Sequence, residues 1–376
     1  MKLRAGVVAA LLLLTTLVLV QTALAQSPDT VVSSRAITAL EATSVEAYWT
    51  EERMRTAKPM PLPTISRSPA ALAAVGPAAG PPVVATSGRP GATPVELSGA
   101  LAERLAQGQE PLFGTFPDVY TRYRLFPNLL SIYQTFPHLI VGKLFFTRGG
   151  LRFVCSGAAV NSTNRAVVWT AGHCVAPGNG GPFHTNFAFV PGRFQGLNPV
   201  GVWTVRQPFT LNGWFFNGLF NYDHGALVMN RLNGVLIGNR TGFLGFAANL
   251  PRGQHWHAQG YPAGARRLFP ATPPGAQYDG EHQEICAASF ARNDQPGRPT
   301  DPPTIGIGCD QTGGTSGGPW TKDFSGVAGA TNILNGNNSY RYTGPNPPQD
   351  LRLFSPYFTS GAINLRNAAQ AVVVSN

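Results

Sequence analysis

Residues 167–178, VVWTAGHCVAPG, place a histidine and a cysteine directly after an apolar run that ends in Thr-Ala-Gly. The β-branched and aromatic residues of the run are typical of a buried strand, and Ala171 and Gly172 form a turn that takes the His173 ring off that strand. A single histidine beside such a strand is more often structural than catalytic. His173 is therefore a catalytic candidate only if the chain also supplies a nucleophile that needs a base.

A second stretch, residues 309–320, reads CDQTGGTSGGPW. Glycine and threonine are common wherever a chain turns, so an ordinary turn is one interpretation. The other is chemical: Gly314, Gly317 and Gly318 free the backbone around Ser316, so that its hydroxyl is exposed and neighbouring N–H groups converge on one point. An acyl-transfer enzyme needs this combination of a nucleophile and preorganised donors for the oxyanion. Serine is a weak nucleophile alone, and His173 would supply its base.

Together the two stretches resemble the histidine motif, TAGHC, and the serine motif, GTSGGP, of the trypsin-like (chymotrypsin-fold) serine endopeptidases. In that family the third member of the triad is an aspartate between the other two. Asp223 stands in NYDHGALVM, where a polar turn enters an apolar strand, and this sequence resembles the family's aspartate motif. The other aspartates of this interval lie in Pro/Gly-rich loops or beside the serine loop: Asp279, Asp294, Asp301 and Asp310.

The resemblance implies a role for each residue. Ser316 attacks the peptide carbonyl, His173 takes its proton and returns it to the leaving amine, and Asp223 holds the ring tautomer. The backbone N–H groups of Gly314 and Ser316 would form the oxyanion hole. The expected protein is a secreted, monomeric serine endopeptidase that acts on proteins or peptides without a cofactor or metal. Two alternatives stay open, a catalytically silent secreted binding protein of the same fold and an esterase that uses the same triad.

Other features are similar to the bacterial glutamyl-endopeptidase branch of the family: the Gly-Tyr-Pro at residues 260–262, the YDHGAL form of the aspartate motif, and Thr-Gly-Gly ahead of the serine. Thr315 precedes the serine where animal relatives carry an aspartate that pairs with a new N-terminus, so that activation switch is absent. In the glutamyl branch a histidine on the strand after the serine reads the substrate glutamate. We expect Thr331 at that position and Gln311 on the opposite pocket wall, which predicts a measurable but incomplete preference for glutamate.

The chain has four cysteines, and an even number in an exported protein usually indicates disulfides. Three pairings are conceivable, and we favour the two between sequence neighbours, Cys155–Cys174 and Cys286–Cys309. The first also matches the disulfide that flanks the histidine loop in the resembling family. A zinc site made of all four thiolates is the alternative, although it normally needs closely spaced C-x-x-C pairs, which the sequence lacks.

The N-terminal part differs in composition from the rest. A basic start and an apolar run precede TALA at residues 22–25, which indicates a signal peptide over residues 1–25. Residues 26–125 are rich in Pro, Ala and Gly, with short helices expected at 45–55 and 96–107, and we interpret them as a propeptide or low-complexity linker that buries little apolar surface. No later apolar run reaches about 18 residues, so no membrane association is expected after signal removal.

Residues 126–376 are expected to form the protease domain. From about residue 138, short strands separated by Gly, Pro and Asn predict an all-β fold. We expect two packed antiparallel six-stranded β-barrels, approximately residues 138–245 and 246–376, with a short C-terminal helix within 362–374. The net charge of +10 comes largely from singly scattered arginines, which favours a solvated basic surface over a nucleic-acid site.

Overall fold

The computed structural model describes residues 27–65, 80–91, 112–114, 118–125, 130–264, 278–327, 329–342 and 351–375. The expected signal peptide at 1–25 and the expected helix at 96–107 lie outside these residues. Within the described part of the chain, no helix combines the length and the apolar character needed to cross a bilayer.

The first barrel is a closed ring of six antiparallel strands. Pairing runs in the order β11-β8-β9-β10-β13-β12, and β12 also pairs with β11, which closes the ring. The long hairpin of β8 and β9 extends from the pair Val141↔Ala158 to the pair Arg148↔Leu151 at its tip. A closed ring leaves none of its six strands with an unpaired edge. The six strands are β8 (Val141–Arg148), β9 (Leu151–Ala159), β10 (Val167–Thr170), β11 (Thr185–Pro191), β12 (Trp203–Leu211) and β13 (Gly225–Met229).

The second barrel uses six strands from the later half of the chain. They pair in the order β24-β20-β19-β16-β21-β22, and Tyr340, three residues after the end of β22, forms an antiparallel bridge with Phe354 of β24. The prediction of two packed six-stranded barrels is thereby confirmed. The strands are β16 (His255–Gly260), β19 (Glu284–Asp294), β20 (Thr304–Gly308), β21 (Pro319–Lys322), β22 (Ile333–Asn337) and β24 (Arg352–Ser355).

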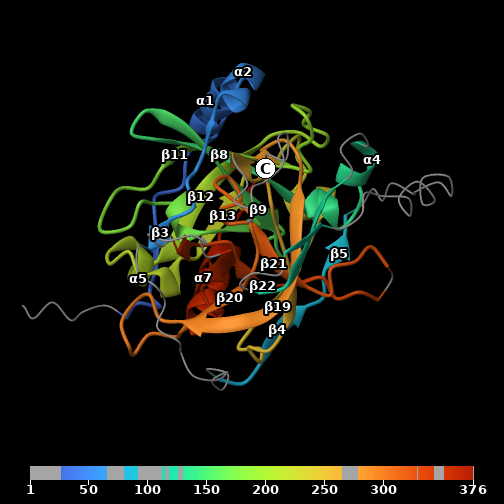
Figure 1. Ribbon diagram of the computed structural model, residues 1–376. Helices are drawn as coiled ribbons and strands as arrows, with labels where there is room; N and C mark the ends of the chain where they lie inside the picture. Colours follow the sequence, from blue (N-terminus) through green and yellow to red (C-terminus); the bar gives the residue numbers. More distant parts are fainter. Residues whose placement is uncertain are drawn as a thin grey trace, which may run out of the picture.

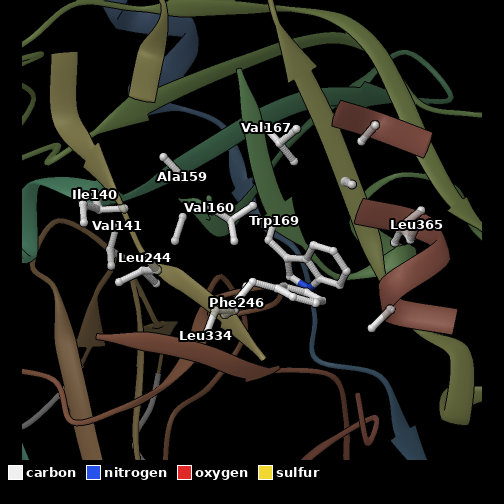
Figure 2. Packing of buried hydrophobic residues seen from close by; sticks show 14 of the residues in the cluster. Ile140, Val141, Ala159, Val160, Val167, Trp169, Leu244, Phe246, Leu334 and Leu365 are labelled. Atoms are coloured by element: carbon white, nitrogen blue, oxygen red, sulfur yellow. The ribbon is translucent and has the colours of Figure 1, made fainter. Parts of the chain in front are cut away.

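The largest hydrophobic cluster lies where the two barrels and the C-terminal helix meet. Figure 2 shows Trp169 of the first barrel beside Phe246, with Leu334 of β22 below them and Leu365 of the helix to one side. The indole Nε1 of Trp169 also donates a hydrogen bond to Oδ1 of Asn337, 3.2 Å away, across the barrel boundary. The helix, α7 (Ser360–Gln370), begins and ends slightly earlier than the sequence predicted. This cluster fixes β10, which leads to His173, against β22 of the second barrel.

Residues 27–60 fold onto the first barrel, so the expectation that the N-terminal region buries little apolar surface is wrong for this part. A capping box between Thr38 and Glu41 starts α1 (Ala39–Tyr48), and α2 (Glu51–Arg55) follows. Figure 1 shows both helices beside β8 and β11. Trp49 is buried against Phe145, and its Nε1 donates to the carbonyl of Asn186 at 2.5 Å. The sequence did not reveal this because the apolar partners belong to distant strands.

Strand β7 (Tyr120–Arg124) pairs antiparallel with β19 from Arg124↔Glu284 to Thr121↔Ala287. The expected domain boundary at residue 126 therefore leaves out a strand that belongs to the sheet of the second barrel.

The remaining strands are β1 (Val31–Ser33), β2 (Lys58–Pro59), β3 (Thr64–Ile65), β4 (Val83–Thr86), β5 (Arg89–Pro90), β6 (Leu112–Gly114), β14 (Gly242–Phe243), β15 (Gly245–Ala248), β17 (Ala263–Gly264), β18 (Tyr278–Asp279) and β23 (Arg341–Tyr342). The short helices are α4 (Leu130–Tyr133), α5 (Asn212–Phe215), α6 (Ile237–Thr241) and the 3₁₀ turns η1 (His138–Ile140), η2 (Gly172–Cys174) and η3 (Phe220–Tyr222).

Candidate active site

His173 lies in the 3₁₀ turn η2, directly after β10 ends at Thr170. The disulfide Cys155–Cys174 ties this turn to β9, with 6.3 Å between the two Cα atoms. A side chain at Gly172 would place its Cβ 2.7 Å from the Trp214 ring and 3.0 Å from an Asp223 oxygen. Glycine at that position therefore lets the turn approach the aspartate closely.

Two hydrogen bonds join His173 to Asp223. The backbone N–H of His173 donates to Oδ1 at 2.7 Å, and its ring Nδ1 lies 2.8 Å from Oδ2. Because an ionised carboxylate only accepts, Nδ1 carries the proton and the lone pair of the neutral ring lies on Nε2. Burial alone would raise the pKa of the fully buried Asp223. The electrostatic interaction with the His173 ring and the hydrogen bonds from His173 and Ser339 outweigh burial and hold that pKa below its usual value.

The second barrel supports the same aspartate. The hydroxyl of Ser339 donates to Oδ2 of Asp223 at 2.5 Å, and the side-chain amide of Asn337 donates to its backbone carbonyl at 3.2 Å. Both residues were missed in the sequence, because they are separated from Asp223 by more than a hundred positions. A serine or an asparagine outside a recognised motif carries no signal of such a contact.

The serine loop packs against the strand that leads to His173. Ser316 accepts a hydrogen bond through its backbone carbonyl from the N–H of Ser156 at 2.7 Å. Gly317 has φ of +77°, and a Cβ there would lie 2.0 Å from Oγ1 of Thr170. Only glycine allows both the left-handed backbone and the close approach. The structure thus brings the predicted serine loop, on the second barrel, to the end of β10, on the first.

Ser316 Oγ and His173 Nε2 are both buried, and neither has a hydrogen-bond partner among the described residues. Native proteins rarely leave buried polar atoms unpaired, since each costs about 1–3 kcal/mol, and exceptions often have a functional reason. The two atoms are the ones that general-base activation of a serine requires. Exposure of Ser316 is 0% and that of His173 is 2%, so another part of the chain covers both.

Gly314 was expected to supply an oxyanion donor. It has φ of +91°, and its backbone N–H donates to a carbonyl oxygen, that of Met60, at 2.9 Å. Ser156 holds the loop from behind, because its hydroxyl donates to the carbonyl of Gly314 at 2.9 Å and accepts from the N–H of Tyr261 at 2.9 Å. The hydrogen bonds of Ser156 therefore fix the loop in which the N–H of Gly314 points at a carbonyl oxygen.

The prediction that Thr331 lies on the strand after the serine is wrong. That strand, β22, begins only at Ile333, and the Thr331 hydroxyl donates to Oδ2 of Asp323 at 2.6 Å in the preceding loop. Ser339, which contacts Asp223, lies beyond the opposite end of β22, and a strand of this length spans roughly 17 Å. Thr331 is therefore not a pocket residue. The expectation failed because the loop after β21 is longer than the sequence suggested, so that β22 begins only at Ile333.

Gln311 is buried, but its side chain is used to hold the serine loop. Its amide donates to the carbonyls of Ala258 and Glu284 at 3.2 and 2.9 Å, and its Oε1 accepts from the Thr315 hydroxyl. Both donor hydrogens therefore have backbone partners, which leaves no amide donor for a substrate glutamate. The expected pocket role of Gln311 is corrected to a positioning role behind the serine.

Both expected disulfides are present, Cys155–Cys174 and Cys286–Cys309, which rules out the four-thiolate zinc site. Within the described residues, the group of side chains close enough to share a metal ion consists of Cys155, His173 and Cys174. The two sulfur atoms are bonded to each other and the histidine faces Asp223. The disulfide and the histidine–aspartate pair account for this group.

No protein-family model matches the chain. It is similar to the crystal structure of the protease Anisep from Arthrobacter nicotinovorans, with 33% identity and a TM-score of 0.51, over 62% of this chain and 96% of that protein. It is also similar to the thermostable serine protease AL20 from an extremophilic microorganism, with 33% identity and a TM-score of 0.50, over 62% of this chain and 98% of that protein.

A curated relative matches over a shorter region. The extracellular metalloprotease of Bacillus subtilis (strain 168) is 32% identical over 111 residues, which are 29% of this chain. This match spans 33% of that relative's own length. The two solved proteases are matched over almost their whole length at a third of identical residues, and the double barrel agrees with them. The chain belongs to the trypsin-like (chymotrypsin-fold) serine endopeptidases.

Proposed function

We propose that this protein is a secreted serine endopeptidase that cuts peptide bonds through Ser316, His173 and Asp223. The observation that carries the proposal is the buried histidine–aspartate pair, with Nδ1 2.8 Å from Oδ2, beside a serine loop that packs on the strand before His173. A protein that only binds a ligand has no use for a buried serine hydroxyl and a buried imidazole nitrogen that both lack partners.

In the proposed reaction, His173 Nε2 takes the proton of the Ser316 hydroxyl as the oxygen attacks the substrate carbonyl. Asp223 keeps the second ring proton on Nδ1 and stabilises the imidazolium that forms. His173 then gives the proton to the leaving amine, and water releases the acyl group by the same route in reverse. Because the pKa of Asp223 is held below its usual value, the carboxylate stays ionised throughout this cycle at neutral pH.

The negative charge on the tetrahedral intermediate would be stabilised by the backbone N–H groups of Gly314 and Ser316. The N–H of Gly314 already donates to a carbonyl oxygen, which supports this role. Loss of one such donor typically costs about 2.7–4 kcal/mol of transition-state stabilisation.

The layout proposed for the precursor is a signal peptide over residues 1–25, a propeptide, and a protease body that includes β7.

We further propose a preference for an acidic side chain before the cut, carried by Arg341. This buried residue comes directly after Tyr340, two positions from Ser339, and its Nη2 lies 3.5 Å from the carbonyl of Cys309. Arg341 brings a positive charge to this segment, which attracts a carboxylate, whereas neither Thr331 nor Gln311 is charged.

The test is Ser316→Ala, with Ser289→Ala as the matched control because Ser289 lies on the exposed part of β19. Loss of a triad nucleophile typically lowers kcat on the order of 10⁶-fold. Each variant is assayed after removal of the propeptide, with a casein digest and a fluorophosphonate label. We expect Ser316→Ala to lose both signals and Ser289→Ala to keep both. Label on a residue other than Ser316, or activity above about 1% in Ser316→Ala, contradicts the proposal.

The two alternatives give different results in the same assays. A silent binding protein would take no label, whereas an esterase would be labelled and would hydrolyse an ester substrate but leave casein intact.

Mass spectrometry of the casein peptides then tests Arg341. We expect Arg341→Met to lower the ratio of kcat/KM for glutamate over leucine at least about tenfold, since a hydrogen bond to a charged group is worth about 1.5–3 kcal/mol.

A further inference from the structure

Residues 58–65, KPMPLPTI, run from the first barrel to the second across the face that carries Ser316. We call these residues the strap. At its start, β2 pairs with β9 through Lys58↔Phe153 and Pro59↔Val154. At its end, β3 pairs with β23 through Thr64↔Arg341 and Ile65↔Tyr342. The strap therefore spans both barrels as an extended segment.

Three backbone hydrogen bonds place the strap beside each part of the proposed triad. Met60 donates its N–H to the carbonyl of Val154 at 2.8 Å, next to the disulfide that holds the histidine turn. The carbonyl of Met60 accepts from Gly314 at 2.9 Å, so it occupies the expected oxyanion donor. The carbonyl of Pro63 accepts from Arg341 at 3.1 Å, two residues after Ser339.

The two apolar side chains of the strap are buried, one in each barrel. Met60 is 5% exposed and packs in the cluster that contains Cys155–Cys174. Leu62 is 6% exposed and packs in the cluster that contains Cys286–Cys309. These contacts supply the hydrophobic part of the attachment to each barrel.

The direction of the strap is opposite to the direction that a substrate must take. The leaving amine receives its proton from His173, which the disulfide Cys155–Cys174 ties to β9, so the part of a substrate after the cut bond lies along β9. The acyl part then lies on the other side of Gly314, along β23. In the strap the earlier residues lie along β9 and the later ones along β23. Accordingly, the strap is parallel to both strands, where a substrate would be antiparallel.

We propose that the strap is an intramolecular inhibitor that binds the active-site face in reversed polarity and is therefore not cut there. This inference rests on the proposed function of the triad. With the Met60 carbonyl at Gly314, the nitrogen of Pro61 lies on the side away from His173, which cannot protonate it. Attack by Ser316 could then only reverse, because the leaving nitrogen stays without its proton.

The alternating prolines fit this role. Pro59, Pro61 and Pro63 each lack an N–H and have φ fixed near −65°, so the free segment is already extended and loses little entropy on binding. Met60, between two of them, makes the N–H contact to β9. An extended segment that is preorganised in this way holds the strand-like path without forming a sheet of its own.

The first test measures how fast a fluorophosphonate labels Ser316 in the precursor that retains the strap. The variants are Leu62→Asp and the milder Met60→Ala, which remove buried contacts. Leu40→Asp is the matched control, since Leu40 lies on α1 of the same N-terminal segment and is 79% exposed. We expect full-length Leu62→Asp to be labelled at least about tenfold faster than the wild-type precursor, and Leu40→Asp to be labelled at the wild-type rate.

Added synthetic peptide KPMPLPTI should slow the labelling of the full-length Leu62→Asp precursor and remain intact by mass spectrometry. This second measurement shows that the faster variant is folded. If the wild-type precursor is labelled as fast as Leu62→Asp and Met60→Ala, the strap does not inhibit and the inference is wrong, while the proposed function stands. If no form is labelled even after the propeptide is removed, the proposed function fails and the inhibitor role fails with it.

Pro61→Ala tests the polarity. It converts the bond between residues 60 and 61 into an ordinary peptide bond that a serine protease can cut. A strap in substrate polarity would then be cleaved there by its own chain, at a rate independent of protein concentration. The reversed polarity predicts that this bond stays intact in the purified precursor, and concentration-independent cleavage at that bond overturns it.

Discussion

Replacing Ser339 by alanine removes one hydrogen bond from the buried carboxylate that orients His173. The hydroxyl lies 2.5 Å from Oδ2 of Asp223, and both residues are fully buried. The same oxygen also faces His173 Nδ1 at 2.8 Å, so the carboxylate keeps its histidine contacts in the variant. The variant therefore weakens the support of the triad without removing any of its members.

The size of the effect follows from the charge of the acceptor. A hydrogen bond to a charged group is worth about 1.5–3 kcal/mol, and one pKa unit corresponds to about 1.36 kcal/mol. Loss of the bond should raise the pKa of Asp223, because the Ser339 hydroxyl is one of the groups that lower it. The bond matters most in the transition state, where the imidazolium forms beside the carboxylate. If most of its worth arises there, kcat/KM falls by about ten- to a hundredfold.

The assay is kcat/KM on a peptide substrate between pH 5 and 9, alongside urea denaturation. Ser355→Ala is the matched control, because Ser355 is an equally buried serine whose hydroxyl bonds the backbone of Pro356 and Asn337. We expect both variants to lose stability, but only Ser339→Ala to lose activity. Activity of Ser339→Ala within about twofold of wild type would show that the carboxylate does not depend on this hydroxyl.

Four further outcomes follow from the structure. Gly317→Ala should prevent folding, since a Cβ would lie 2.0 Å from Thr170, whereas Gly234→Ala, with φ of +75° and open space around it, should cost only about 1–3 kcal/mol of stability. Loss of the Cys155–Cys174 disulfide opens a loop whose ends are 19 positions apart. The free energy of unfolding, measured by urea denaturation, should fall by about 3 kcal/mol. Burial lowers the pKa of His224 to about 4, so the unfolded chain binds a proton that the folded ring does not. Stability should therefore be full above pH 6.5 and fall as the pH drops toward 4, by about 3 kcal/mol for this ring, and a His224→Phe variant should show a flatter pH dependence. Thr331→Ala should leave the cleavage preference unchanged in a peptide digest, and a changed preference would place Thr331 in the pocket after all.

Local patterns were sufficient for the parts of the site that sit in turns. The TAGHC turn needs glycine at position 172 to approach Trp214 and Asp223, and the serine loop needs glycine at positions of positive φ. The glycines in the sequence therefore indicate both turns. The pairing of Cys155 with Cys174 also joins sequence neighbours. The pocket was predicted wrongly because it depends on where a strand begins. Gln311 is buried near the serine loop, as a pocket residue would be. The spacing of residues in the sequence could not show which carbonyl groups would accept its amide hydrogens.

The sequence by itself determined the alternation of short strands and turns, the two glycine-dependent loops, and which serine, histidine and aspartate to expect in the triad. Each of these depends on local backbone conformation or on the chemistry of single residues. Only the tertiary structure decided which distant groups complete them. Ser339 reaches Asp223 across 116 positions, and the strap brings Met60 to Gly314 with a direction that no composition could reveal. The sequence of a proline-rich segment does not indicate which strands it will contact. Its few apolar side chains and free backbone groups are stabilised only when they pack and hydrogen-bond against strands of both barrels.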